Sequence, residues 1–252
     1  MTFSFVPSAL SATMVALACL ATTAQAQAPA NGSVALPAAA NNAASVTAPQ
    51  VVAHYAHLVH SNYSDTLAAA KAMQTAISAF TSQPSAATLA EARKTWLAAR
   101  EFYGQTEAFR FYGGPIDNDN GPEGRINAWP MDESFVDSVQ GKASAGLVNN
   151  RKFVISKKNL SAQNERGGEE NIATGWHAIE FFLWGQDVSD TGPGERSFED
   201  FVDGKAPNAD RRRQYLNVVT ELLIDDLTSL VKAWAPDAKN NYRARFVKGN
   251  RE

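Results

Sequence analysis

The chain has 252 residues, of which 44% are hydrophobic and 19% charged, so it can bury a substantial core and does not have the composition of a disordered chain. The formal net charge is -3, and the basic residues are scattered along the chain, so nucleic acid is not an expected partner. The only cysteine is Cys19 in an N-terminal apolar segment, which excludes a disulfide framework or a cysteine metal site in the body of the protein.

The N-terminal segment predicts a secretory signal peptide over residues 1–26. An apolar run from 10 to 21 is too short to span a bilayer comfortably, and Ala24-Gln25-Ala26 after it is a small-x-small cleavage pattern. The stretch before the run carries no Lys or Arg, which is unusual for such a signal. Cys19 could instead carry a lipid, although the residues before it fit a lipidation motif poorly. No later run is apolar enough to cross a membrane, so the mature protein is expected to be soluble or peripheral.

Residues 27–50 are predicted to form a flexible linker. They are rich in Ala, Asn, Pro, Ser and Gln and hold almost no large apolar side chains. Such a segment cannot compensate the entropy lost on ordering.

Two long amphipathic helices are predicted next. In the first, from Val51 to Phe80, the apolar residues recur at helical spacing, namely Val52, Tyr55, Val59, Tyr63, Leu67, Ala70, Met73 and Ile77. Gln83-Pro84 stops it. The second runs from about Ala87 to Phe111, and Gly113-Gly114-Pro115 ends it.

The middle of the chain is predicted to be mostly loop. Residues 113–131 hold many Gly, Pro, Asn and Asp residues, which is typical of consecutive turns. A short helical piece is predicted at 132–140, and a turn-rich region follows as far as Gly168.

Two further helices complete the prediction. The segment from Glu169 to Trp184 is apolar nearly all round, which places it in the middle of a bundle. A loop over 187–208 precedes a long final helix from about Ala209 to Trp234. Because no segment shows the period-2 alternation of a strand, the fold class is all-α, a helical bundle.

His177 and Glu180 are the strongest candidates for chemistry. Three residues apart on a helix, their side chains share one face, with Cβ atoms about 5 to 6 Å apart, so they can bind one ion. Burying such a pair on an apolar helix costs free energy unless it is hydrogen-bonded, charge-paired or metal-bound. The alternative that the pair only fixes the packing of the helix remains open. The HExxH zinc-protease motif is absent because Ala178 and Phe181 occupy its other positions.

A second candidate group is formed by Arg100, Tyr103 and Glu107, which follow one helical face. Glu107 could complete an oxygen-rich site with the first pair. The alternative is that Arg100 and Glu101 belong to a solvated face and that Glu107 is only a charge at a helix end.

Weaker candidates lie elsewhere. His54, His57 and His60 follow an i, i+3, i+6 series that fans over about 120° of a helix surface and is more typical of a partly solvated face. Asp117 and Asp119 resemble the start of a calcium loop, but no closing Glu follows at the EF-hand spacing.

Three strings in one order carry a family resemblance. They are the segment from Trp96 to Phe109, the segment from Asn171 to Asp187 with its Gly-x-His-x-x-Glu core, and Gly192-Pro193-Gly194-Glu195-Arg196. Over about residues 50–245 the chain resembles the imelysin-like family, and it is most similar to the iron-regulated protein A branch.

The resemblance implies an all-helical fold of two bundle-like halves, export in Gram-negative bacteria and a link to iron acquisition. It also implies a metal site at His177 and Glu180, with Glu107 contributing from a neighbouring helix. Residues 51–247 would form the helical domain. Members of the family are longer, so we expect this chain to hold the first bundle and only part of the second.

The sequence therefore predicts an exported metal-binding protein, periplasmic or associated with the outer membrane. Imidazole and carboxylate ligands suit iron, zinc and copper, and the resemblance favours iron. The expected partners are the metal ion and an iron-transport component of the outer or inner membrane. The alternative function is a metallopeptidase in which the same pair holds a catalytic metal.

Overall fold

The computed structural model describes residues 45–249. The predicted signal peptide (1–26), Cys19 and all but the end of the predicted linker lie outside the described residues. Within 45–249 the secondary structure is helical, with one isolated β-bridge between Val139 and Lys142 and no strand. The all-α prediction is confirmed.

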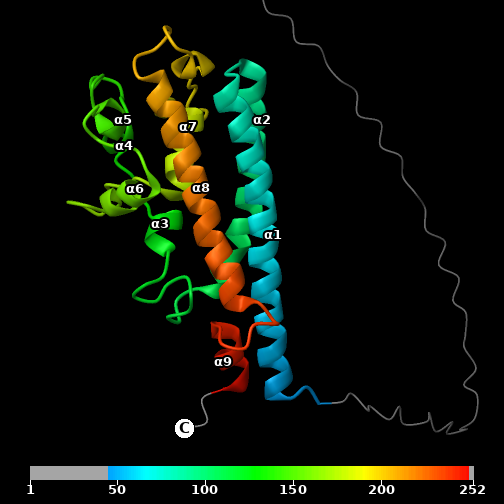
Figure 1. Ribbon diagram of the computed structural model, residues 1–252. Coiled ribbons are helices and arrows are strands. Elements are labelled where there is room, and N and C mark those ends of the chain that lie inside the picture. The colour runs from blue at the N-terminus through cyan, green and yellow to red at the C-terminus, as the bar shows by residue number, and fades with distance from the viewer. Residues whose placement is uncertain (1–44, 250–252) are drawn as a thin grey trace, which may run out of the picture. The chain divides into compact units, whose positions relative to one another are not determined.

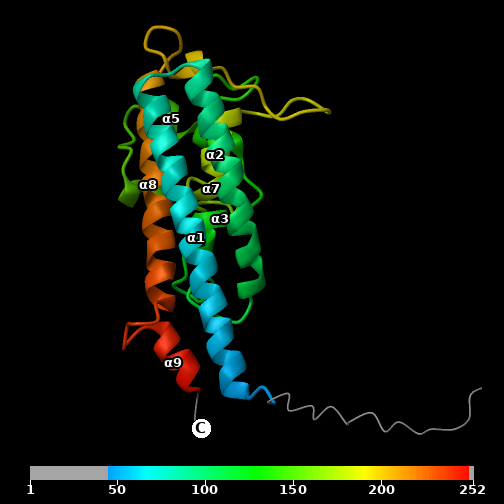
Figure 2. The same cartoon turned by 90° about the vertical axis from the view of Figure 1, so that its right-hand side faces the viewer.

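Three long helices lie side by side, and shorter elements pack around them (Figures 1 and 2). The long helices are α1 (Ala48–Ser82), α2 (Ala86–Gln105) and α8 (Ala209–Trp234). The shorter elements are the helices α3 (Glu123–Asn127), α4 (Glu133–Val136), α5 (Gly146–Asn149), α6 (Lys157–Gln163), α7 (Gly175–Trp184) and α9 (Tyr242–Lys248), with the 3₁₀ turns η1 (Thr106–Phe109) and η2 (Phe198–Phe201). Helix α1 packs against both α2 and α8, and α7 packs against α2 and α8.

Helix α1 forms as the apolar spacing predicts, although it begins earlier. Its side chains at Val59, Tyr63, Met73 and Ile77 are almost completely buried. The helix starts at Ala48 because Thr47 and Gln50 form a capping box, so the last residues of the predicted linker are helical.

Helix α2 is shorter than predicted at its C-terminal end. It begins after Ser85, whose hydroxyl accepts from the Thr88 backbone N–H at 3.2 Å. After Gln105 the chain tightens into the η1 turn, where the Thr106 hydroxyl donates to the Tyr103 carbonyl at 2.7 Å. Such side-chain bonding to the preceding turn competes with a regular α-helix, so the prediction of a helix to Phe111 is wrong.

The middle region contains more helix than predicted. Helix α3 lies inside the segment 113–131 that was expected to be loop, and it follows turns in which the Gly121 N–H donates to the Asn118 carbonyl at 2.7 Å. Its Ile126 is fully buried, and this tertiary burial stabilises a helix of five residues that would not form alone. Helix α4 lies within the predicted piece 132–140.

Helix α7 begins six residues later than predicted, at Gly175. This glycine has φ +81°, and an added Cβ would overlap the backbone carbonyls of Arg125 and Ile126. The preceding segment is held outside a helix by tertiary hydrogen bonds, since the Ala173 N–H donates to Asn164 Oδ1 at 2.9 Å and the Thr174 hydroxyl donates to the Arg125 carbonyl at 2.9 Å. These contacts place α7 against α3. Helix α8, by contrast, has the predicted bounds.

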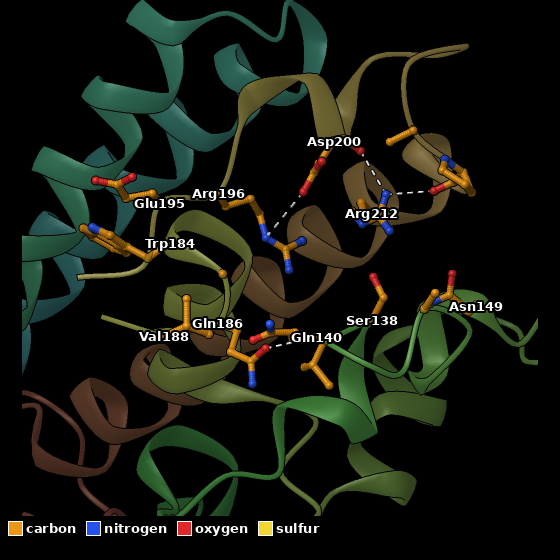
Figure 3. A pocket seen from close by; sticks show the side chains of 15 residues that line it. Ser138, Gln140, Asn149, Trp184, Gln186, Val188, Glu195, Arg196, Asp200 and Arg212 are labelled. Carbon is orange, nitrogen blue, oxygen red and sulfur yellow. Dashed lines mark hydrogen bonds and ion pairs between the residues drawn. The ribbon is translucent and has the colours of Figure 1, made fainter. Parts of the chain in front are cut away.

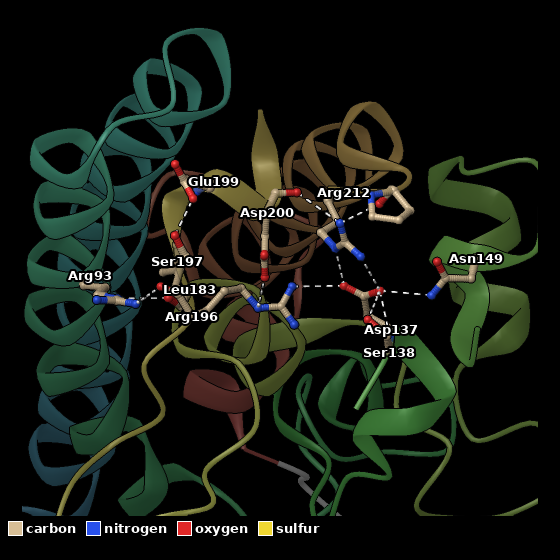
Figure 4. A network of polar contacts seen from close by, with 11 residues as sticks. Arg93, Asp137, Ser138, Asn149, Leu183, Arg196, Ser197, Glu199, Asp200 and Arg212 are labelled. Carbon is tan, nitrogen blue, oxygen red and sulfur yellow. Dashed lines mark hydrogen bonds and ion pairs between the residues drawn. The ribbon is translucent and has the colours of Figure 1, made fainter. Parts of the chain in front are cut away.

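A buried ion-pair network joins α4, α5 and α8 to the segment after α7 (Figure 4). Asp137 is 0% exposed, and its carboxylate accepts from Arg212 Nε at 2.6 Å, from Arg196 Nη1 at 3.0 Å and from Asn149 Nδ2 at 3.2 Å. Burial raises the pKa of Asp137, but the hydrogen bonds and charges of Arg212 and Arg196 outweigh it, so the pKa lies below its ordinary value. The network therefore fixes the chain around the C-terminal end of α7.

In the part of the chain that the structure describes, no helix combines the length and apolarity needed to cross a membrane.

Candidate metal centre

Helix α7 brings His177 and Glu180 together as their spacing predicts. His177 Nδ1 lies 3.1 Å from Glu180 Oε2. The two side chains are 16% and 42% exposed, respectively, so both are half-buried where the sequence predicted a buried pair. The other residues of α7 are buried, except for Trp184 at its C-terminal end, which is half-buried.

The pair lines a pocket of about 390 Å³. Two more carboxylates, Glu133 and Asp187, line the same pocket, and none of the residues given for its lining is Lys or Arg. Its other walls are largely apolar, formed by Trp96, Leu97, Trp129, Met131, Phe181, Trp184 and Pro193. The pocket therefore combines an acidic rim with aromatic walls, which favours a cation.

The electrostatics of Glu133 show how crowded this acidic lining is. Burial raises the pKa of Glu133, Arg196 opposes that shift, and the charges of Asp187, Asp132 and Glu180 raise it further. Mutually repelling carboxylates are relieved when a cation binds among them.

The ring of Trp129 lies against the imidazole of His177. The centroid of its ring lies 4.7 Å from that of His177, although 69% of Trp129 is exposed. A ligand imidazole needs a fixed ring orientation, which is commonly supplied by its surroundings. The tryptophan ring, tilted by 48° to the imidazole, limits the directions in which the His177 nitrogens can point.

The donor pair fits one metal ion. Two ligands at about 2.1 Å from an ion, the usual distance for imidazole nitrogen and carboxylate oxygen, lie roughly 3.0 to 3.4 Å apart at adjacent positions of an octahedron or tetrahedron. The observed 3.1 Å separation meets that requirement. Within residues 45–249, however, no three His, Cys, Asp or Glu side chains are gathered closely enough to hold an ion. The arrangement thus offers two ready ligands rather than a complete set.

Glu107, the third expected ligand, is not brought into a group with the pair. It lies in the η1 turn, where its Oε1 is 3.1 Å from Arg110 Nη2, and its side chain is 49% exposed. The change from α-helix to 3₁₀ turn at Thr106 alters the face on which Glu107 projects.

Arg100 is packed into the protein and does not belong to the solvated face of the alternative prediction, and Tyr103 is fully buried. The Arg100 guanidinium lies 5.3 to 5.9 Å from the ring centroids of Trp96, Tyr103 and Trp176, and it donates to Asn127 Oδ1 at 2.9 Å. Burial lowers the pKa of Arg100, while the charges of Tyr103, Glu180 and Glu107 oppose that shift. Glu101 is exposed, as the solvated-face alternative predicted.

The weaker candidates do not form a metal-binding group among the described residues. His54 and His57 are exposed on α1. Burial lowers the pKa of His60, and the charges of Arg243 and His57 lower it further, which favours the neutral imidazole. Asp117 accepts a hydrogen bond from the Phe111 backbone N–H, and Asp119 is exposed.

Sequence reasoning missed Glu133, Asp187 and Trp129. They come from α4, the loop after α7 and the segment before α4, so no fixed spacing links them to His177. The one local signal was a tryptophan among Pro and acidic residues, in the string from Trp129 to Glu133.

Comparison with known proteins points to one family. The family model for imelysin matches residues 59–252. Iron-regulated protein A of Synechococcus elongatus is 37% identical over 71 residues, which is 28% of this chain and 19% of that protein. The crystal structure of an iron-regulated protein A precursor from Parabacteroides distasonis aligns with a TM-score of 0.55 at 23% identity, over 82% of this chain and 52% of the other. The chain therefore spans about half the length of that structure and less of the curated relative.

Proposed function

Because the chain belongs to the imelysin family, we propose that it is an exported metal-binding protein that holds its ion through His177 and Glu180. The observation that carries the proposal is the 3.1 Å contact between a nitrogen and an oxygen donor at the edge of an acidic pocket. The ion would sit where the lining carboxylates now repel one another. The resemblance to imelysin-like proteins expected from the sequence is confirmed.

Iron is the proposed ion, with zinc or copper as the other candidates by ligand type. The two relatives described above are named as iron-regulated proteins, which supports iron here. We propose that the bound metal serves iron acquisition and passes to or from a transport component of the outer or inner membrane.

The proposed location is the periplasm or the surface of the outer membrane. The N-terminal apolar run and its cleavage pattern support export. The solved relative is named as a precursor, which supports the same proposal.

Calorimetric titration with ferrous, ferric, zinc and copper ions tests the metal proposal. We expect the double variant His177→Ala, Glu180→Ala to lose at least about 100-fold in affinity, because removing even an outer-shell partner commonly costs 10- to 100-fold. The matched control is His57→Ala, Glu101→Ala, which removes an exposed histidine and an exposed glutamate outside the pocket. Equal affinities in the wild type and the first variant would show that the pair only packs the bundle.

Glu107→Gln tests the third expected ligand in the same titration. With Glu107 paired to Arg110 and not gathered with the other two, we expect the affinity to stay within about twofold of the wild type. A tenfold loss would show that Glu107 reaches the bound ion.

A metallopeptidase is the second proposed function, favoured by the carboxyl of Glu133 in the same pocket as the pair. A bound metal would activate water, and a nearby carboxyl could accept its proton. If this is correct, metal-dependent cleavage of unfolded casein is expected to disappear in both Glu180→Gln and Glu133→Gln, and to persist in Glu101→Gln. Retained cleavage in Glu180→Gln would reject the pair as the catalytic centre.

A further inference from the structure

A second cavity, of about 540 Å³ (Figure 3), shares Trp184 and Gly185 with the lining of the metal pocket. Its volume is in the range of pockets that bind small molecules, about 300 to 1,000 Å³. Arg196, Gln186 and Asp200 supply polar groups, and Val139 and Val188 supply apolar wall. None of these residues belongs to the proposed metal site.

The guanidinium group of Arg196, which lines this cavity, is held in a fixed position. Its backbone N–H donates to the Trp184 carbonyl at 2.8 Å, and its own carbonyl accepts from Arg93 Nη2 at 2.9 Å. The guanidinium donates through Nη1 to Asp137 at 3.0 Å and lies 4.9 Å from the ring centroid of Phe181. The side chain is held by contacts on several sides before any ligand arrives.

Two guanidinium nitrogens, Nε and Nη2, have no hydrogen-bond acceptor among the described residues. The Arg196 side chain is only 5% exposed. Figure 3 shows the guanidinium pointing into the cavity toward Gln186. Gln186 Oε1 already accepts from the Gln140 backbone N–H at 2.9 Å, which leaves the Gln186 amide nitrogen as a second donor. An arginine with a neighbouring amide donor is a typical receptor for a carboxylate.

An acceptor for a cation lies beside these donors. Asp200 Oδ2 forms a long ion pair with Arg196 Nε at 4.0 Å, without a hydrogen bond, and the Asp200 side chain is 42% exposed, so its oxygens can still accept from a ligand. The hydrogen bond from Arg212 to Asp200 uses the backbone carbonyl, so the carboxylate is free of that contact. A carboxylate-binding edge and a cation-binding oxygen therefore stand next to each other, with Val139 and Val188 nearby.

We propose that this cavity binds an α-amino acid with an apolar side chain. The ligand carboxylate accepts from Arg196 Nη2 and the Gln186 amide, its ammonium group faces Asp200, and its side chain packs against the valines. A simple carboxylate would meet Asp200 without a compensating positive charge, and a simple amine would leave the Arg196 donor unpaired.

Three matched probes test this proposal by calorimetry on the purified chain. They are L-leucine, 4-methylpentanoate, which lacks only the amino group, and 3-methylbutylamine, which lacks only the carboxylate. We expect L-leucine to bind at least about tenfold more tightly than either single-charge probe. Equal binding of leucine and either other probe would overturn the proposal, as would the absence of leucine binding.

Asp200→Asn provides the test on the protein side. It keeps the size of the side chain and the backbone carbonyl that Arg212 uses, so the Asp137 network is preserved. The variant is expected to bind leucine no better than 4-methylpentanoate. The control Asp190→Asn changes an exposed residue that does not line the cavity and should keep the preference for leucine. An unchanged preference in Asp200→Asn would contradict the assigned ammonium contact.

Discussion

Replacing Asp137 with asparagine is expected to lower the free energy of unfolding by about 3 to 5 kcal/mol, the usual result of removing one partner of a buried ion pair. The carboxylate is 0% exposed and accepts from both Arg196 and Arg212. Asparagine is nearly isosteric, so the loss comes from charge rather than volume. Two buried guanidinium groups would remain without their shared counter-charge. Urea unfolding of the two proteins measures the difference.

The matched control is Asp203→Asn. Asp203 pairs with Arg213, the neighbour of Arg212 on α8, at 2.9 Å, but its side chain is 73% exposed. A solvent-exposed pair contributes at most about 1 kcal/mol, so this variant should unfold almost as the wild type does. Similar losses of unfolding free energy in the two variants would contradict the claim that burial makes the Asp137 ion pair important for stability.

The Asp137 effect also has a defined pH dependence. Because the folded-state pKa of Asp137 lies below its ordinary value, the carboxylate stabilises the fold above the unfolded pKa, about 3.9. That contribution is lost as the pH falls through the folded pKa. The difference between the wild type and Asp137→Asn should therefore be constant near neutral pH and shrink below about pH 4.

Gly175→Ala is the second substitution with a large expected effect, a loss of about 3 kcal/mol or more in the free energy of unfolding. Gly175 has φ +81°, which is unfavourable for alanine, and a Cβ there would overlap the carbonyls of Arg125 and Ile126. Relief requires α7 to move away from α3. His177 lies two residues further along, so metal affinity should fall as well.

Gly141→Ala separates backbone strain from this overlap. Gly141 has φ +78°, but nothing lies within 4 Å of an added Cβ. The free energy of unfolding of this variant should fall only by the strain of a left-handed alanine, about 1 to 2 kcal/mol. Thermal or urea unfolding of both variants gives the comparison, and equal losses would show that the contact with α3 is unimportant.

The long helices could be predicted because their apolar residues repeat at the helical period. Helix α8 has the predicted bounds, and α1 differs only at its ends. The start of α7 could not be predicted, because the Ala173 and Thr174 contacts that keep residues before Gly175 out of the helix come from distant segments. Helix α3 depends on the burial of Ile126, which periodicity over five residues cannot reveal.

The candidate site could be predicted only in part. Local spacing was sufficient to bring His177 and Glu180 together, since both lie on one helix. The tertiary fold alone brings Glu133 and Asp187 to the same pocket. The predicted alignment of Glu107 with the pair depends on a helix that continues through residue 107, but α2 ends at Gln105 and a 3₁₀ turn follows.

Anomalous diffraction from crystals soaked with ferrous or zinc ions tests the central claim most directly. We predict one strong peak at about 2.0 to 2.2 Å from both His177 Nδ1 and Glu180 Oε2. The peak should be absent from crystals of the His177→Ala, Glu180→Ala variant soaked in the same way. A peak at other residues, or none at this pair in the wild type, would contradict the assignment of α7 as the metal-binding helix.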